Sequence, residues 1–237
     1  MYFKNTHSET NFPYDIVIDD LPLIEKESTK FLGVTIDSNL TWNNHINNIC
    51  TSTSRSLGIL YKLKYFLPQK TLCILYNTLI LPLISYCNLV WGNCSKTRIQ
   101  PLFLLQKRAL RICTNSHYLA HTDPLFFQLK TLKLEDIHTF QTSIFMFKFS
   151  KNLLPTTFQN IFTPNSNIHS YPTRHSSDLH LTNPKIILAH KTIRHHGPDI
   201  WNPLPDYVKH CASLYSFKAV MKKYLLSQYN HEINNSL

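Results

Sequence analysis

Lysine and arginine side chains recur on one predicted helix, with a spacing typical of a surface that holds a polyanion. Residues 99–113 read IQPLFLLQKRALRIC. At about 100° per residue, an apolar stripe forms on one side of this helix. The stripe consists of Leu102, Leu105, Ala109 and Ile112. The cations fall roughly opposite or on the flank, and they are Lys96, Lys107, Arg111 and Arg108. We expect them to project away from the core and to suit phosphate, although an ordinary solvated basic face is the open alternative.

The distribution of charge favours an anionic partner. Residues 38–122 carry nine lysines and arginines and no aspartate or glutamate, whereas residues 1–37 have a net charge of −4. The whole chain has a formal net charge of +10. A long stretch without carboxylates creates a positive field that suits nucleic acid. It also excludes a carboxylate-based two-metal site within residues 38–122.

Two other groups of residues invite a chemical reading that the sequence does not favour. Asp19 and Asp20 could hold Mg²⁺, but no third carboxylate lies on a plausible neighbouring strand, so we interpret the pair as a turn. Five histidines, at positions 175, 180, 190, 195 and 196, lack a nearby cysteine and fit no standard zinc spacing.

The six cysteines form no CxxC pair, and most fall on apolar helix faces. This pattern is typical of reduced thiols in an intracellular protein of the nucleus or cytoplasm. Met1 is followed by a mainly polar stretch without an apolar run, so we expect no secretion signal.

The elements that must position these residues are mostly helices. We predict short strands at 15–18, 21–24 and 30–36, a helix at about 41–63, a second opened by Pro68, and a third from about Thr97. The outer face of helix 41–63 carries amides and hydroxyls together with Arg55 and Lys62, groups that contact phosphate and sugar. Residues 71–95 lack charge, but polar residues and Pro82 interrupt them, so a buried helix kinked or ended at Pro82 is favoured over a membrane span.

The C-terminal half predicts further helices. They lie at about 121–132, 134–151 and 213–229, with a polar loop at 162–178. Residues 179–181 and 185–193 could pair as a small β-hairpin, and GPDIWNPLP at 197–205 predicts a rigid segment whose Trp201 plugs the core. The prediction is therefore a mainly α fold with a small N-terminal antiparallel sheet, a three-helix bundle and a helical C-terminal region.

Several segments resemble the reverse transcriptases of non-LTR (LINE-type) retrotransposons. KFLGVTIDSNLTWNNHI at 30–46 resembles the segment that follows the polymerase palm. Further segments resemble the family in the expected order: LILPLISYCNLVWG at 79–92, LQKRALRIC at 105–113, HTDPLF at 121–126, GPDIWNPLP at 197–205 and SLYSFKAVMKKYLL at 213–226.

The resemblance implies a layout of three parts. Residues 1–37 would be a remnant of the palm base, with Phe31, Leu32, Gly33 and Val34 as the primer-grip turn. Residues 38–115 would be the thumb, which tracks an RNA–DNA hybrid or template–primer duplex. Residues 116–237 would be the element's C-terminal region.

The departures from the family imply a fragment without its chemistry. The family's aromatic-x-Asp-Asp motif lies well upstream of its FLGV-like segment, whereas Asp20 lies eleven residues before Phe31. We expect a truncated reverse transcriptase that lacks the catalytic carboxylates and needs the palm and fingers of its parent. Mg²⁺ would then be a cofactor of the complete polymerase and not of this chain. The alternative is a non-catalytic interaction remnant without a nucleic-acid role, and convergence of the cations of the first and third helices on one concave surface would favour the thumb.

Overall fold

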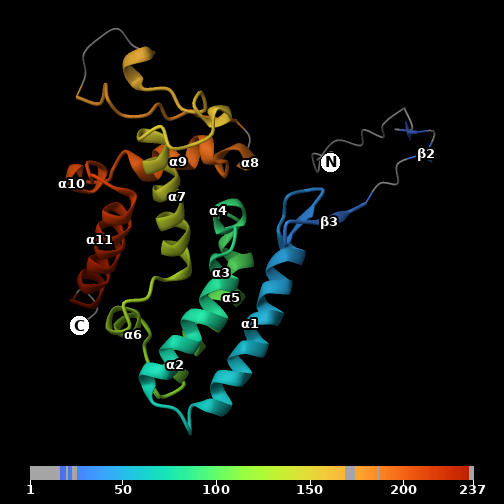
Figure 1. Ribbon diagram of the computed structural model, residues 1–237, viewed down its shortest axis with the longest axis vertical. Helices are drawn as coiled ribbons and strands as arrows, with labels where there is room; N and C mark the ends of the chain where they lie inside the picture. The colour runs from blue at the N-terminus through green and yellow to red at the C-terminus, as the bar shows by residue number, and fades with distance from the viewer. Residues whose placement is uncertain (1–16, 20, 23–25, 169–173, 186, 235–237) are drawn as a thin grey trace.

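The chain folds into an elongated arrangement of helices with β-hairpins at its N-terminal side (Figure 1). The computed structural model describes residues 17–19, 21–22, 26–168, 174–185 and 187–234. Strands β1 (Val17–Ile18) and β2 (Leu21–Pro22) pair antiparallel, and Asp19 adopts a positive φ of 50° in the turn between them. The predicted turn is confirmed at Asp19, whereas Asp20 lies outside the described residues.

A second hairpin replaces the single strand predicted at 30–36. Strands β3 (Ser28–Phe31) and β4 (Val34–Asp37) pair antiparallel, with Phe31 opposite Val34. Leu32 and Gly33 form the two-residue turn, with φ angles of 45° and 83°. Two positive φ angles match the twist of paired strands, and the glycine accepts this backbone without strain. The prediction of one continuous strand at 30–36 was wrong, because Leu32 and Gly33 adopt the backbone of a two-residue turn, whereas the turn that the resemblance implied at 31–34 is present.

The three predicted helices form a bundle in which α1 (Asn43–Leu63) and α5 (Lys96–Cys113) run side by side in the same direction (Figure 1). The chain returns between them through four short elements. These are α2 (Gln69–Leu75), the π-helical turn η1 (Tyr76–Ile80), α3 (Leu81–Ser85) and α4 (Asn88–Trp91).

Before Pro82, the helix changes from the α-helical to the π-helical hydrogen-bond pattern. Leu81 N–H bonds to the carbonyl of Tyr76, five residues back, which is the π pattern. Proline has no N–H to donate and crowds the preceding turn, so an ordinary α-helix does not pass through it unchanged. The helix resumes as α3 and ends before Cys87, whose φ is +49°.

The C-terminal region consists of helices joined by turns and longer loops. Its elements are α6 (Asp123–Gln128), α7 (Leu134–Ser150), the 3₁₀ turns η2 (Thr156–Phe158) and η3 (Asn165–Asn167), α8 (Ile187–His190), α9 (Ile193–Trp201), α10 (Asp206–Lys209) and α11 (Leu214–Asn234).

One prediction for this region was wrong. Most of residues 185–193 is helical, so the proposed hairpin with 179–181 does not form, and Leu179 instead makes an isolated bridge to Pro164. The rigid GPDIWNPLP segment forms the end of α9 and the turn that follows it. An apolar run of four or more residues fits a helix or a strand equally well, and here helix packing decided the outcome.

The core consists of two apolar clusters. The first packs Ile46 of α1 and Trp91 of α4 with Trp201 and Phe217 of the C-terminal region, so the predicted burial of Trp201 is confirmed. The second packs the lower halves of α1, α2 and α5 with α6 and α11. Gln106, fully buried, donates hydrogen bonds to the Tyr76 hydroxyl and the Leu132 carbonyl and so ties α5 to both neighbours. Within the described part of the chain, every helix is too short or too polar to span a bilayer.

Candidate nucleic-acid interface

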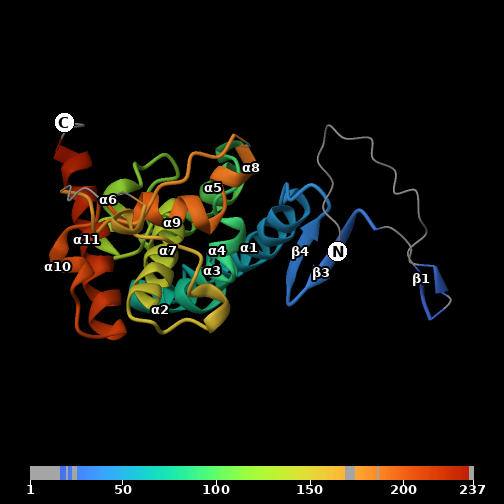
Figure 2. The ribbon, with the colours of Figure 1, turned by 90° about the horizontal axis from the view of Figure 1, so that it is seen from above.

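The β3–β4 hairpin is fixed to the start of α1 by side-chain hydrogen bonds. The Asp37 carboxylate accepts hydrogen bonds from the backbone amides of Thr41 and Trp42, at 2.8 and 2.7 Å. Asn48 on α1 donates to the Thr35 hydroxyl at 3.3 Å, and the Thr35 amide donates to His45 Nδ1 at 3.3 Å. Seen from above, the hairpin lies beyond the N-terminal end of α1, away from α11 (Figure 2).

The turn of the hairpin also contacts the end of α3. The Tyr86 hydroxyl donates a hydrogen bond to the Leu32 carbonyl at 2.7 Å. A Cβ placed on Gly33 would lie 3.3 Å from Cε1 of the Tyr86 ring, a close approach. The Tyr86 carbonyl in turn accepts a hydrogen bond from the indole of the fully buried Trp91. The hairpin is therefore held at both of its ends, by α1 and by a residue anchored to the core.

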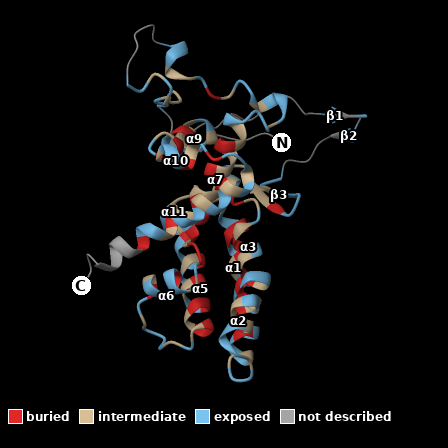
Figure 3. Cartoon of the chain, turned by 60° about the vertical axis from the view of Figure 1, so that its left-hand side comes forward, coloured by how far each residue is buried: buried red, intermediate tan, exposed pale blue. Residues whose placement is uncertain are grey.

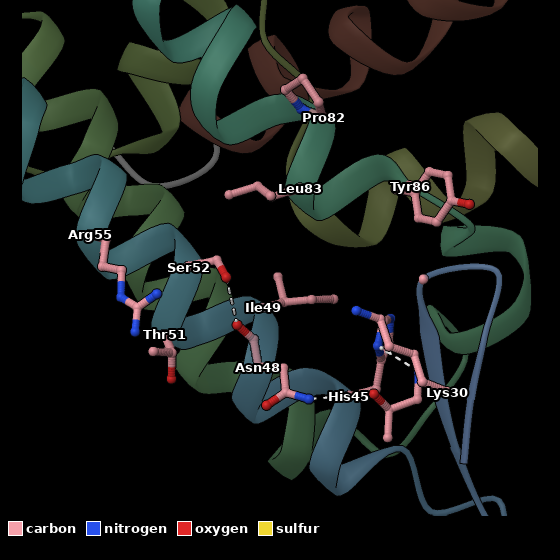
Figure 4. Close-up of a pocket in the computed structure, with 12 residues that line it drawn as sticks. Lys30, His45, Asn48, Ile49, Thr51, Ser52, Arg55, Pro82, Leu83 and Tyr86 are labelled. Carbon is pink, nitrogen blue, oxygen red and sulfur yellow. Dashed lines mark hydrogen bonds between the residues drawn. The ribbon is translucent and has the colours of Figure 1, made fainter.

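These contacts enclose a groove of about 610 Å³ between the hairpin, α1 and α3. Figure 4 shows Asn48, Thr51 and Arg55 along α1 with Leu83 and Tyr86 across from them. We call this the hairpin groove. It is lined by Lys30, Gly33, Thr35, His45, Asn48, Ile49, Thr51, Ser52, Arg55, Pro82, Leu83 and Tyr86.

The hairpin groove is positively charged. Lys30 of β3 and Arg55 of α1 are exposed, and neither forms an ion pair with a residue that the structure describes. No carboxylate lies among the lining residues. His45 adds no charge near neutral pH, because burial lowers its pKa. Two such cations in the hairpin groove suit two phosphates of a nucleic-acid backbone.

Two hydroxyls of the hairpin groove, those of Thr51 and Ser52, use their hydrogens within α1 and can only accept from a ligand. Thr51 Oγ1 donates to the Asn47 carbonyl at 2.9 Å, and Ser52 Oγ donates to the Asn48 carbonyl at 3.0 Å. Each oxygen keeps its lone pairs after its hydrogen is used in this way. These two oxygens are therefore matched to a donor on a ligand, such as a ribose 2′-hydroxyl, more than to a phosphate oxygen.

The cations of α5 are placed differently from the expectation. The Lys107 ammonium lies 4.5 Å from the centre of the Phe103 ring, and Arg111 Nε donates to the Ala120 carbonyl at 2.9 Å. Both side chains are half-buried and contact other parts of the fold, whereas the sequence predicted that they project away from the core. Lys96 and Arg108 are exposed. None of these four residues lines the hairpin groove, so the structure does not bring the α5 cations together with Arg55 there.

The other residues singled out from the sequence divide between surface and core. Lys62 is exposed at the end of α1. Phe31 and Leu32 are 63% and 74% exposed at the turn, whereas Val34 is buried. Sequence reasoning missed Lys30 as a site residue, although its position beside the FLGV segment was a signal that it would lie with the turn.

No cluster suited to a metal accompanies the groove. His190 Nδ1 and His195 Nε2 lie 3.2 Å apart, and His195 Nδ1 lies 2.6 Å from the Thr182 carbonyl. Across the described residues, no three histidine, cysteine, aspartate or glutamate side chains gather where they could hold a metal ion.

Comparison with known proteins connects the chain to mobile elements. It is 24% identical over 129 residues to a probable RNA-directed DNA polymerase from transposon X-element of Drosophila melanogaster, a match that covers 52% of this chain and 14% of the relative. It is 27% identical over 109 residues to the probable RNA-directed DNA polymerase from transposon BS of the same organism, covering 44% of this chain and 12% of the relative.

A third match agrees with these two. The RNA-directed DNA polymerase from mobile element jockey, also of Drosophila melanogaster, is 26% identical over 115 residues, which are 46% of this chain and 12% of the relative. No protein-family model matches the chain, and no solved structure matches it. The chain is thus related in sequence to RNA-directed DNA polymerases of non-LTR retrotransposons, over a stretch that spans about an eighth of their length.

Proposed function

We propose that this chain is a thumb-like module that holds a template–primer duplex by its backbone in the hairpin groove. The observation that supports it is that Lys30 and Arg55, both exposed and unpaired by any described carboxylate, line the same groove. They come from a strand and a helix that Tyr86 and Asp37 hold in fixed relation. Contacts of this type fix the position of a duplex without reading its sequence.

An RNA-containing strand is the preferred occupant. A ribose 2′-hydroxyl donates a hydrogen bond that deoxyribose lacks, and the Thr51 and Ser52 oxygens have lone pairs that accept one. The proposal therefore assigns an RNA–DNA hybrid to the groove in preference to a DNA duplex. Lys96 and Arg108 on α5 add to the positive field without a contact inside the groove.

Catalysis is not assigned to this chain alone. The FLGV-containing hairpin resembles a part of the family that follows its catalytic motif, and residues 38–122 contain no carboxylate. The proposal places nucleotidyl transfer in a palm and fingers portion of a parent protein, inside the nucleus or cytoplasm where template and primer occur. Primer extension on poly(rA)/oligo(dT) with Mg²⁺ or Mn²⁺ is the assay, and incorporation by the pure chain would contradict this assignment.

The duplex assignment is tested by equilibrium binding of a labelled RNA–DNA hybrid. Changing both Lys30 and Arg55 to Gln should weaken binding about tenfold or more at 0.1 M salt, since two phosphate contacts are lost. The matched control changes Lys218 and Lys222 to Gln, two exposed cations of α11. An equal loss in both variants would mean a diffuse attraction and would contradict a site in the groove.

Strand preference is tested with Thr51→Val and Ser52→Ala. Both changes remove a hydroxyl oxygen and keep the charge of the groove unchanged. Affinity for the hybrid should fall toward that for a DNA duplex of the same sequence, whereas affinity for the DNA duplex should stay the same. A fall of equal size for both duplexes would contradict recognition of the 2′-hydroxyl.

A further inference from the structure

The last turn of α1 and the turn that joins it to α2 carry three exposed aromatic rings, two of which lie against a lysine. Phe66 is 82% exposed, Tyr65 is 69% exposed and Tyr61 is 47% exposed. The turn lies at the lower end of the molecule, and its residues are largely exposed (Figure 3). Exposing an apolar ring such as that of Phe66 to water is unfavourable. A group of exposed rings at one projecting turn therefore indicates a binding surface for a partner.

The rings hold a defined arrangement. The Tyr61 and Tyr65 rings lie edge to face with centres 6.2 Å apart. The Lys64 ammonium lies 4.7 Å from the centre of the Tyr61 ring and 4.9 Å from that of Tyr65. A cation near two ring faces is attracted by their negative electrostatic potential, and this attraction orders all three side chains.

The backbone beneath the rings is closed by hydrogen bonds. Lys64 N–H donates to the Leu60 carbonyl, while the amides of Phe66 and Leu67 both donate to the Leu63 carbonyl. Leu60 is fully buried, and Leu63 and Leu67 pack on the second apolar cluster. The rings are therefore presented on a closed turn anchored in the core, so little order is lost when a ligand binds.

The charge around the rings is positive. Lys62 and Lys70 flank the turn in the sequence and are exposed, and no acidic residue occurs between positions 38 and 122. Aromatic faces interleaved with cations match single-stranded nucleic acid, whose bases stack on rings while its phosphates meet ammonium groups. A duplex does not offer free base faces along its length, so this surface differs in kind from the hairpin groove.

We propose that the α1–α2 turn is a stacking platform for unpaired bases of single-stranded RNA or DNA, with Tyr65 and Phe66 as the stacking rings and Lys62 and Lys64 as phosphate contacts. Tyr61 lies six residues beyond Arg55, which is about 9 Å farther along the axis of α1. Six residues also turn Tyr61 about 120° around the helix axis from Arg55, so the two sites lie on different faces of α1. The platform itself does not depend on the groove binding a duplex.

The test uses a short single-stranded oligouridylate that contains one 2-aminopurine, whose fluorescence is quenched by stacking. The variant changes Tyr65 and Phe66 to Ala, and Tyr215→Ala is the control because Tyr215 is 86% exposed on α11. Wild type and control should bind and quench the probe equally. The double variant should lose about tenfold or more in affinity, together with the quench.

A second variant separates stacking from simple apolar contact. Changing Tyr65 and Phe66 to Leu keeps apolar bulk but removes the flat π faces, so it should lose the quench as the Ala variant does. Equal melting temperatures for all variants are expected because the changed side chains are exposed.

Three results would overturn the platform. They are unchanged affinity and quench in the double variants, an equal loss of affinity for a blunt-ended hybrid, and a loss of binding to phosphatidylserine vesicles while the single strand binds normally. The last result would assign the rings to a membrane surface. If the groove variant, Lys30→Gln with Arg55→Gln, binds the hybrid as tightly as wild type, the groove proposal is contradicted and the platform proposal is not affected.

Discussion

The Tyr86 hydroxyl donates a 2.7 Å hydrogen bond to the carbonyl of Leu32, which lies 54 residues earlier in the chain. This bond joins the turn of the β3–β4 hairpin to the end of α3 and closes one side of the hairpin groove. Without it, Lys30 would be held through the α1 side of the hairpin alone.

Tyr86→Phe removes the hydroxyl and keeps the ring. Because Tyr86 is half exposed, unfolding free energy should fall by no more than about 1 kcal/mol. Affinity for the hybrid should fall clearly, since the hairpin loses its tie to α3. Tyr207→Phe, at an exposed tyrosine of α10, is the control in denaturant melts and hybrid titrations. Wild-type binding by Tyr86→Phe would contradict a role for this bond in shaping the groove.

Substitution of two glycines by alanine should change the unfolding free energy in opposite directions. Gly33→Ala should destabilise by about 1 kcal/mol or more, because φ is +83° and the new Cβ would lie 3.3 Å from the Tyr86 ring. Gly58→Ala lies within α1, where an added Cβ meets nothing within 4 Å, so it should stabilise by about 0.5–1 kcal/mol. Urea unfolding midpoints decide both signs, and a stabilised Gly33→Ala protein would refute the turn geometry.

Trp201 should be structural. It is 8% exposed, its ring lies 6.1 Å from that of the fully buried Phe217, and replacing such a residue by Ala typically costs about 3–5 kcal/mol. Tyr215→Ala, with an exposed side chain, should leave the melting temperature nearly unchanged. A Trp201→Ala protein that melts like wild type would mean that the indole does not support the fold.

His138 should make the fold sensitive to acid. Burial, and then the charge of His196, lowers its pKa to about 4, against 6.5 for a free histidine, although its hydrogen bond to the Asn88 carbonyl acts in the opposite direction. The unfolded chain therefore binds a proton that the folded chain rejects between about pH 6.5 and pH 4. The resulting loss of stability is absent above pH 6.5 and grows as pH falls, to about 2 kcal/mol by about pH 5.

His138→Gln keeps a donor for the Asn88 carbonyl and removes the titration. Its stability should decline less than that of wild type between about pH 7 and pH 5 in urea melts. His45 and His196, whose pKa values are also lowered by burial, account for a decline that persists in the variant. An identical pH dependence in both proteins would show that His138 is not the group that titrates.

The sequence predicted the helices better than the site, for a physical reason. The predicted helices at 41–63, 134–151 and 213–229 each correspond to a single observed helix, because long periodic patterns favour one state over many turns. Residues 187–193 were misassigned because a short apolar run has no period that separates helix from strand.

The groove could be predicted only in part. Arg55 could be predicted because it lies on the polar face of a periodic helix. Lys30 reaches the groove only because the chain turns at Gly33 and Tyr86 holds that turn. Helical projection places Arg111 on the outer face but carries no information on the loop whose Ala120 carbonyl it bonds. Contacts between segments far apart in the chain have no local signature.

The proposed contacts of Lys30 and Arg55 with duplex phosphates in the hairpin groove are tested most directly by the salt dependence of binding. Each phosphate contact adds about 0.7–0.9 to the slope of log K against log salt, so Lys30→Gln with Arg55→Gln should flatten the slope for an RNA–DNA hybrid by about 1.4–1.8. The α11 control, Lys218→Gln with Lys222→Gln, should keep the wild-type slope. An unaltered slope in the groove variant would contradict the proposed contacts.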